Sequence, residues 1–333
     1  PASFGRVRFQ HRSTFEFLAA WSLRDMLRDE RTRAKIERLL FPTVFDVTTI
    51  TPELRPIAAW LAHWDEKIRE KIIEVEPIEL VRFGDPKSLP LESRKKLLTT
   101  LSEKHSTGDV SRTDVDDRAV WAFSTKELSD EIRKAWKANR HWDFRILLLD
   151  MIAQAKIHAL VDIASEAVRL KADGRALIFR GVNALFALGE TSRLKKVASD
   201  LVSGKLTADD DTVVGLCLQL YPKFLSTQDI ITLIKRAKTP KKFSTRGFSW
   251  RIVELFRLCP DAEIDMFLNG ISSLALMQPF NDDYERISKR YGYLADHFAE
   301  IAQLALDRLD DPKTSTGLIN LLLASERSSD RSS

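Results

Sequence analysis

The stretch FGRVRFQHRSTFEFLAAWSL, residues 4–23, changes its hydrophobic period in the middle, and this change indicates the fold. Residues 6–10 alternate polar and apolar side chains, which predicts a short strand. From Ser13 onward, apolar residues recur on one helical face: Phe17, Leu18, Trp21, Leu23 and Leu27. Ser13 and Glu16 have the spacing of a capping box. The sequence therefore predicts a strand that leads directly into a long helix.

The composition of the chain is that of a globular, helical protein. Of its 333 residues, 44% are apolar and 30% are charged, with only 12 Gly and 12 Pro. Few glycines argue against a glycine-loop nucleotide fold, and few turn signals argue against a β-sandwich. No apolar run reaches the roughly 18 residues of a membrane span. Cys217 and Cys259 lie in apolar contexts, which predicts buried free thiols in a reducing compartment.

Beyond the first helix, the pattern favours an array of helices. Helix-start signals are Ser124 with Glu127, Asp173, Thr191, Thr207 with Asp210, Ser226 with Asp229, and Ser244, with unmarked starts near His141 and Ile157. Helices then begin about every 16–19 residues, so that a two-helix unit spans roughly 32–38 residues, as in helical-hairpin repeats. We therefore predict an all-α fold, an irregular α-solenoid of HEAT-like helical hairpins preceded by the short strand.

Four parts are expected along the chain. Residues 1–42 form the strand and the long helix, 43–117 a second helical domain, 118–327 the repeat domain and 328–333 a disordered tail. The polar stretch 105–117 marks a boundary, and residues 282–309 are expected to form one long helix before a last one that starts at Asp311-Pro312. Because the chain enters structure directly from Pro1, we expect it to be a segment of a longer protein.

The motifs of catalysis are missing from the sequence. None of the six histidines has an HExxH-type partner, and there is no CxxC pair, GxSxG elbow or Walker lysine loop. Acidic pairs such as Asp116-Asp117 precede helices, where they complement the positive end of the helix dipole. We therefore expect a segment that is not itself an enzyme and that holds no metal.

A basic stretch offers one binding surface. Residues 231–257 carry eight basic side chains against the single acid Glu254, a net charge of +7, with Phe243, Phe248 and Trp250 interleaved. Such a surface can neutralise phosphates and stack on bases. In the alternative, the aromatic residues belong to the core and the cations are solvated. The residues of this candidate patch for nucleic acid or another anionic partner are Lys235, Arg236, Lys238, Lys241, Lys242, Arg246 and Arg251.

The opening stretch also resembles a known signature. Phe9-Gln10-His11-Arg12-Ser13, followed by Glu16-Phe17-Leu18-Ala19-Ala20, is similar to the FxHxSxxEYLAA signature at the end of the winged-helix domain of STAND-class ATPases, especially bacterial NACHT proteins. Residues 54–62, LRPIAAWLA, and residues 77–98 look like the helical segment that often follows it. Phe17 replaces the commoner tyrosine, and the Walker motifs are absent. The resemblance covers roughly the first 105 residues, on the numbering of this chain.

This resemblance implies a role for His11. In the family, the histidine at this position contacts the β-phosphate of bound ADP, so that His11 would sense nucleotide in the full-length protein. Phe9, Phe17 and Leu18 would be packing residues, and Glu16 a cap or a structural acceptor. The alternative is a strand-end histidine that local backbone groups satisfy. ATP or ADP with Mg²⁺ is expected in the upstream domain, and no cofactor in this segment.

Three functions are open on the sequence. The one we favour is the regulatory and sensor segment of a NACHT-type ATPase of bacterial antiphage defence, which recognises a trigger and controls nucleotide-dependent oligomerisation in the cytoplasm. Its partners would be the upstream NACHT domain in cis, a protein trigger and further copies of the full-length chain, without a membrane. The alternatives are a stand-alone HEAT-like scaffold for other proteins and a nucleic-acid-binding repeat centred on residues 235–251.

Overall fold

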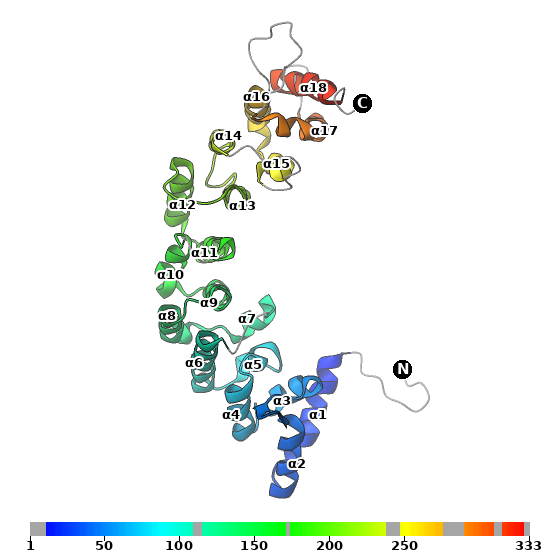
Figure 1. Ribbon diagram of the computed structural model, residues 1–333, viewed down its shortest axis with the longest axis vertical. Helices are drawn as coiled ribbons and strands as arrows, with labels where there is room; N and C mark the ends of the chain where they lie inside the picture. The colour runs from blue at the N-terminus through cyan, green and yellow to red at the C-terminus, as the bar shows by residue number, and fades with distance from the viewer. Residues whose placement is uncertain are drawn as a thin grey trace, which may run out of the picture. The chain divides into compact units, whose positions relative to one another are not determined.

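The computed structural model describes residues 11–108, 115–170, 174–237, 247–275, 290–309 and 315–329. Over these ranges the chain is all-α, with helices α1–α18 and one two-stranded antiparallel sheet (Figure 1). The predicted all-α helical-repeat fold is confirmed. The strand expected at residues 6–10 lies outside the described residues, and none of the described helices has the length and apolarity that a membrane crossing requires.

The chain divides into two compact units, residues 1–189 and 190–333. This division differs from the expected limits at 42 and 117, because α1 packs against α3 and α5 against α7 across those positions. The α-helices of the first unit are α1 (Arg12–Met26), α2 (Glu30–Leu40), α3 (Arg55–Leu61), α4 (Glu66–Val75), α5 (Glu79–Arg82), α6 (Leu91–Thr107), α7 (Asp117–Phe123), α8 (Ser129–Ala138), α9 (Trp142–Gln154), α10 (Val161–Ala167) and α11 (Arg175–Ala187).

Short elements join these helices. The antiparallel strands β1 (Thr43–Val44) and β2 (Val47–Thr48) form a hairpin between α2 and α3, with Thr43 opposite Thr48 and Val44 opposite Val47. Four 3₁₀ helices complete the unit: η1 (Pro52–Leu54), η2 (Pro86–Ser88), η3 (Lys126–Leu128) and η4 (His158–Leu160).

Helices of the first unit stack on the second-next helix along the chain. One row consists of α3, α5, α7, α9 and α11, and the other of α4, α6 and α8, which continues through η4 (Figure 1). Each helix buries an apolar face between these neighbours, as Leu97, Leu98 and Leu101 of α6 do. Two layers of helices stacked in this way are the architecture of a helical-hairpin solenoid.

The second unit repeats this arrangement. Its elements are α12 (Thr191–Ser203), α13 (Asp210–Leu220), α14 (Thr227–Arg236), α15 (Phe248–Arg257), η5 (Asp261–Glu263), α16 (Ile264–Ala275), η6 (Gly292–His297), α17 (Phe298–Leu306) and α18 (Thr316–Ser329). Helices α12, α14, α16 and α18 form one row, and α13, α15 and α17 the other.

Arginine side chains hold the carboxyl ends of several helices. Arg69 of α4 donates to the carbonyl of Ala62 at 2.7 Å, and Arg145 of α9 donates to that of Trp136 at 3.3 Å. In the second unit, Arg308 donates to the carbonyl of Phe256 at 3.1 Å. The last carbonyls of a helix have no partner within it, and a cation also complements the negative end of the helix dipole. These arginines therefore join neighbouring helices through groups that packing alone would leave unsatisfied.

Local capping signals predicted some helix starts correctly. The Ser226–Asp229 capping box is present, and His141 is the residue before α9. Other starts were wrong: α13 is capped by Asp209 rather than Thr207, and the hydroxyl of Ser124 donates back to Val120 at 2.6 Å. The expected caps Asp173 and Ser244 lie outside the described residues.

The carboxyl-terminal predictions also need correction. Residues 290–309 form η6 and α17 rather than part of one long helix. The last helix starts at Thr316, where the Ser315 hydroxyl accepts from the Leu318 amide at 3.1 Å, and not at residue 311. Helix α18 includes residues 328 and 329 of the expected tail, while 330–333 lie outside the described residues. The stretch 105–117 is not all linker either, because α6 extends through Thr107.

His105 is a buried histidine in the core of the first unit. Its side chain is 3% exposed and stacks on Phe144, with ring centroids 5.0 Å apart. The ring of His141 lies 5.3 Å away, and neither nitrogen of His105 has a hydrogen-bond partner in the described chain. Burial, followed by the nearby His141, lowers the pKa of His105 to about 4, although Asp143 opposes the shift.

We expect this histidine to make the fold sensitive to acid. The fold favours the neutral imidazole, so the contribution is fully present above about pH 6.5 and is lost as the pH falls towards 4. His105→Phe should remove at most about 3 kcal/mol of this loss, measured by denaturant unfolding at several pH values. The exposed His158→Gln is the control. An equal acid sensitivity in His105→Phe and the parent chain would contradict the prediction.

Candidate functional site

His11 precedes the first described helix. It is the N-cap residue of α1, with extended backbone (φ −119°, ψ 127°) and an exposed side chain. Its carbonyl accepts from the amide of Thr14 at 3.2 Å, whereas its imidazole makes no capping hydrogen bond. An exposed imidazole at this place can donate a hydrogen bond to an anion such as a phosphate oxygen.

The predicted capping box at Ser13 and Glu16 is wrong. Helix α1 already includes Arg12, and the Glu16 carboxylate accepts from Arg12 Nε at 2.8 Å. Glu16 is thus an acceptor for a side chain of its own helix. In a capping box this carboxylate would accept from a backbone N–H, but here it accepts from Arg12 instead.

An aromatic cluster joins α1 to α3. Phe17 lies edge-on to Trp60, with centroids 5.1 Å apart, and its ring is 5.6 Å from that of Trp64. Trp21 meets Trp64 at 5.6 Å and 89°, and the guanidinium of Arg24 lies 3.9 Å from the Trp21 centroid. Edge-to-face pairs and a cation over an indole are favourable contacts beyond their buried area. The predicted common face of Trp60 and Trp64 therefore packs on Phe17, half-buried.

His63 makes a second contact, which joins the helices α1 and α3 to residues 77–98. We call these packed segments the first block. Its Nε2 accepts from the amide of Asp85 at 3.1 Å, and its Nδ1 lies 3.1 Å from the Ser88 hydroxyl. Burial lowers the pKa of His63. Gly84, at φ +75°, lets the backbone pass close to the ring, because a Cβ there would lie 3.0 Å from Nε2. This contact joins His63, which directly follows residues 54–62, to residues 77–98. No local sequence motif predicts it.

The pairing of Ser88 with His63 is not that of a nucleophile and its base. Because Nε2 accepts a backbone N–H, the ring hydrogen is on Nδ1 and is donated to the Ser88 oxygen. The Ser88 hydroxyl in turn donates to the Asp85 carbonyl at 3.0 Å. Nucleophilic catalysis needs the imidazole to accept the hydroxyl proton instead. The arrangement holds the loop in place.

Ion pairs and a hydrogen bond fix α2 and the end of the hairpin to α3 and α4. Arg33 of α2 makes a two-pronged contact with Asp65, at 3.2 and 2.6 Å, and Asp65 caps α4 through the Ile68 amide. This arrangement lowers the pKa of Asp65 despite the cost of its burial. Glu76 accepts from the Ile50 amide at 2.8 Å and from Arg55 at 2.9 Å, which anchors the end of the hairpin.

One side of α1 remains exposed. Leu18 and Met26 are 43% and 46% exposed there, while Trp21, 45% exposed, lies on the Phe17 side in the aromatic cluster. Leu18 is not buried within the described chain, so the expectation that it packs stays a prediction for the full-length protein, whereas Phe17 does pack; Phe9 lies outside the described residues. Helix α1 buries only Ala20 along its length. It is apolar on two sides, of which the Phe17 side meets α3.

The basic patch is partly used by the fold. Lys238, Lys241, Lys242 and Arg246 lie outside the described residues. Arg236 donates to the carbonyls of Leu201 and Val202 at the end of α12, the former at 3.2 Å. Arg251 pairs with Glu254 at 2.6 Å, and the Lys235 side chain is exposed. Phe248 is 2% exposed, as a core residue would be.

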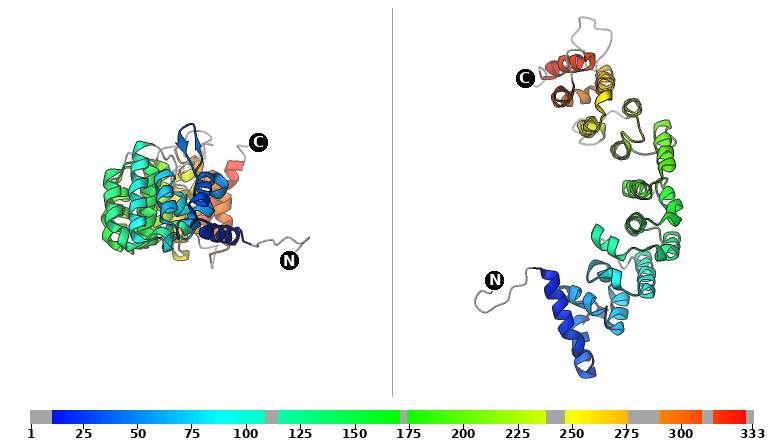
Figure 2. Two further views of the ribbon diagram at one scale, coloured as in Figure 1. Left: turned by 90° about the horizontal axis from the view of Figure 1, so that it is seen from below. Right: turned by 180° about the vertical axis from the view of Figure 1, so that it is seen from behind.

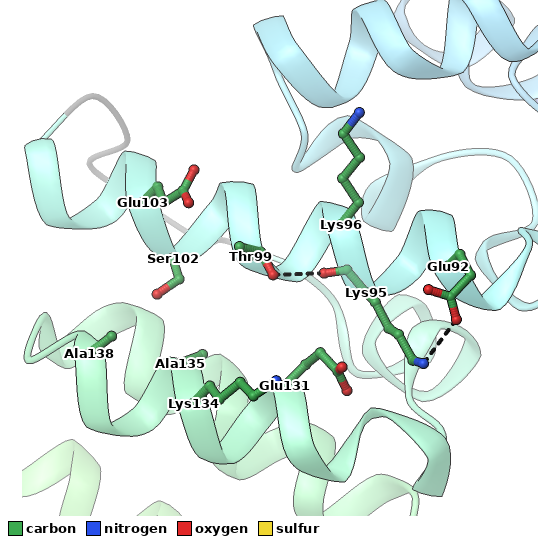
Figure 3. Close-up of a pocket in the computed structure, with 10 residues that line it drawn as sticks. All are labelled: Glu92, Lys95, Lys96, Thr99, Ser102, Glu103, Glu131, Lys134, Ala135 and Ala138. Carbon is green, nitrogen blue, oxygen red and sulfur yellow. Dashed lines mark hydrogen bonds and ion pairs between the residues drawn. The ribbon is translucent and has the colours of Figure 1, made fainter.

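A groove of about 490 Å³ separates α6 from α8 (Figure 3). Thr99, Ser102, Ala135 and Ala138 line it between charged rims of both signs. Lys95 is held by Glu92 at 2.9 Å, and Lys96 and Glu103 point away from α8 in the close-up. Because as many glutamates as lysines line it, the groove has no net charge to favour one sign of ligand.

Metal ligands and thiols are the remaining candidates for chemistry in the chain. Over the described ranges, no three His, Cys, Asp or Glu side chains converge on a point where a metal could bind. The predicted buried thiols are confirmed: Cys217 and Cys259 are free and buried, and burial raises the pKa of both. Comparison with known proteins finds no matching family model, no matching curated protein and no matching solved structure.

The aromatic cluster is open to a stability test. Phe17→Ala should lower the free energy of unfolding by about 2 kcal/mol, because it removes a ring that contacts both Trp60 and Trp64. Leu18→Ala, one residue along on the exposed side, is the matched control and should change it by less than about 0.5 kcal/mol. Denaturant unfolding followed by tryptophan fluorescence measures both. Equal losses would show that Phe17 does not fix α1.

The basic patch can be tested separately for its contribution to stability and for nucleic-acid binding. Arg236→Ala should cost about 1–2 kcal/mol of stability, since two helix-end carbonyls lose a charged donor, whereas Lys235→Ala should be neutral. For the binding hypothesis, Lys241→Glu with Lys242→Glu is titrated with DNA and RNA against the unchanged chain. Nucleic-acid binding that the double variant leaves unaltered, or no binding by either, would contradict that hypothesis.

Proposed function

We propose that this chain is the regulatory and sensor segment of a NACHT-type STAND ATPase of bacterial antiphage defence. It has no catalysis of its own and acts in the cytoplasm. Its helical repeats recognise a trigger, and the segment transmits the event to a nucleotide-binding NACHT domain upstream in cis. The parent protein then oligomerises.

The observation that carries this proposal is the packing of the resembling stretches on one another. Phe17, from the signature that starts α1, packs on Trp60 of residues 54–62. His63, next to that stretch, holds Asp85 and Ser88 of residues 77–98. Segments that share a family resemblance and also form one packed block support a common origin, since packing restricts sequence at all of them together.

The position of His11 supports a sensor role. Its exposed imidazole stands at the start of a helix that Phe17 fixes to the rest of the block. A phosphate held by the upstream domain would accept a hydrogen bond from it. The exposed side of α1, with Leu18 and Met26, gives that domain an apolar surface on which to pack. Movement of α1 would then carry the state of the nucleotide into the repeats.

The nucleic-acid alternative receives less support. Of the described basic residues in the patch, Arg236 and Arg251 already serve partners within the fold. Solenoids recognise partners through extended surfaces, and a protein trigger suits a chain of modest net charge, +4. The stand-alone scaffold remains the alternative if the parent gene encodes no P-loop before residue 1.

A first test is the gene itself. The proposal expects a GxxxxGK[ST] P-loop in the residues encoded upstream. An upstream sequence without one would remove the proposal.

A second test uses the parent protein that contains the upstream domain. His11→Ala should reduce the ADP that co-purifies by about tenfold or more, because a hydrogen bond to a charged phosphate is lost. The bound nucleotide is quantified by chromatography after denaturation. His158→Ala, at another exposed histidine, is the control and should retain ADP. Normal retention by His11→Ala would count against the sensor role.

A further inference from the structure

The hairpin between α2 and α3 presents an aromatic ring to solvent. Phe45 is 96% exposed, and its flanking residues Val44 and Val47 are 57% and 59% exposed. Leu39, at the end of α2, is 58% exposed. In the left view of Figure 2 the hairpin, drawn in a paler blue than α1, stands clear of that helix. Three large apolar side chains are thus exposed on the hairpin, and Leu39 is exposed where the base of the hairpin meets α2.

The backbone at the tip is unfavourable for the residue that occupies it. Phe45 and Asp46 both have positive φ, 52° and 62°. Two successive positive φ values are the pattern of a type I′ turn, which favours Asn-Gly and disfavours aromatic side chains. Glycine would relieve this strain, and the Phe45 ring gains no burial in return. Strain at an exposed apolar residue points to a role outside the fold.

The hairpin is held firmly at its base. The hydroxyls of Thr43 and Thr48 lie 2.9 Å apart, and the Thr49 amide donates to the Pro42 carbonyl at 3.1 Å. Thr51 reaches back to the end of α2, where its hydroxyl donates to the Leu39 carbonyl at 2.6 Å. The base of the hairpin is therefore fixed next to the last turn of α2.

Three basic side chains form a stripe along α2, the helix that directly precedes the hairpin. Arg31, Lys35 and Arg38 are exposed and lie four and three residues apart, so that they share one face of the helix with Leu39. No ion pair joins any of these three cations to another residue in the described part of the chain. The other face of α2 is engaged through Ile36, Leu40 and the Arg33–Asp65 pair. The positive charges of the stripe can therefore pair with the carboxylates of a partner.

We propose that the basic stripe and the hairpin tip form a docking surface for an acidic segment of a protein partner that also carries apolar side chains. Its carboxylates pair with Arg31, Lys35 and Arg38, while its apolar side chains cover Leu39, Val44, Phe45 and Val47. Interfaces commonly combine a central apolar or aromatic anchor with a charged rim. This proposal does not rest on the proposed function.

The surface fits a protein better than a lipid bilayer or a nucleic acid. Asp46 stands beside Phe45 at the tip, where an inserting loop would have to bring its charge into the hydrocarbon. Single-stranded nucleic acid is bound on aromatic platforms, whereas this surface combines one aromatic ring with three aliphatic side chains.

The test is a selection from a random peptide library displayed on phage. The chain is the target, and the Phe45→Ser variant is used for counter-selection. We expect enriched peptides to combine Asp and Glu with Leu, Ile or Phe. Labelled copies should bind the chain saturably in fluorescence anisotropy. Phe45→Ser, and separately Lys35→Glu with Arg38→Glu, should each weaken binding about tenfold or more, the latter with a loss of salt dependence.

Matched controls come from exposed residues elsewhere in the first unit. Trp121→Ser removes another exposed aromatic side chain, and Lys137→Glu with Arg140→Glu reverses two exposed charges near the end of α8. Both should leave binding unchanged. A Phe45→Gly variant should raise the thermal unfolding midpoint and still lose binding, which separates recognition from folding.

Several results would overturn the proposal. These are failure to enrich peptides over the counter-selected variant, enriched peptides without acidic residues, and controls that weaken binding as much as the test variants. Phosphatidylserine vesicles or single-stranded DNA that bind the same residues more tightly than the peptides would assign the surface to a membrane or to nucleic acid instead.

Discussion

The contact between Phe17 and the Trp60–Trp64 pair decides where α1 lies in the first unit. Trp21 adds a second contact on Trp64, and Ala20 is the one residue of α1 that is fully buried, so these aromatic contacts supply most of what fixes α1 against α3. His11 is the N-cap residue of α1, and His63 lies just after α3, the helix that contains Trp60. One aromatic cluster therefore sets the position of the signature histidine relative to the loop that His63 holds, and the functional account depends on it.

The remainder of each unit is built by repetition. Helices stack on the second-next helix, and arginines such as Arg69 and Arg308 close helix ends against their neighbours. This construction forms regular layers without requiring the same residues at equivalent positions of each repeat. The layers require apolar faces and a donor for each helix end, and many sequences satisfy both.

Sequence alone predicts the parts of this structure that depend on near neighbours in the chain. The Ser226–Asp229 box, the start of α9 after His141 and the burial of both cysteines follow from local patterns. The failures have physical causes. Glu16 is taken by Arg12, Asp209 lies closer to its helix than Thr207 does, and His63 meets Ser88 across 25 residues. Nothing local predicts the exposed tip at Phe45, because an apolar pair such as Val44-Phe45 is expected to be buried until the turn geometry is known.

The central claim is that His11 faces a nucleotide phosphate when the parent protein is at rest. A structure of that protein purified with ADP measures the claim directly. The account predicts an imidazole nitrogen of His11 within about 3 Å of a phosphate oxygen, with α1 still packed on Trp60 and Trp64. A bound ADP whose phosphates lie far from His11, or a parent protein that binds no nucleotide, would contradict it.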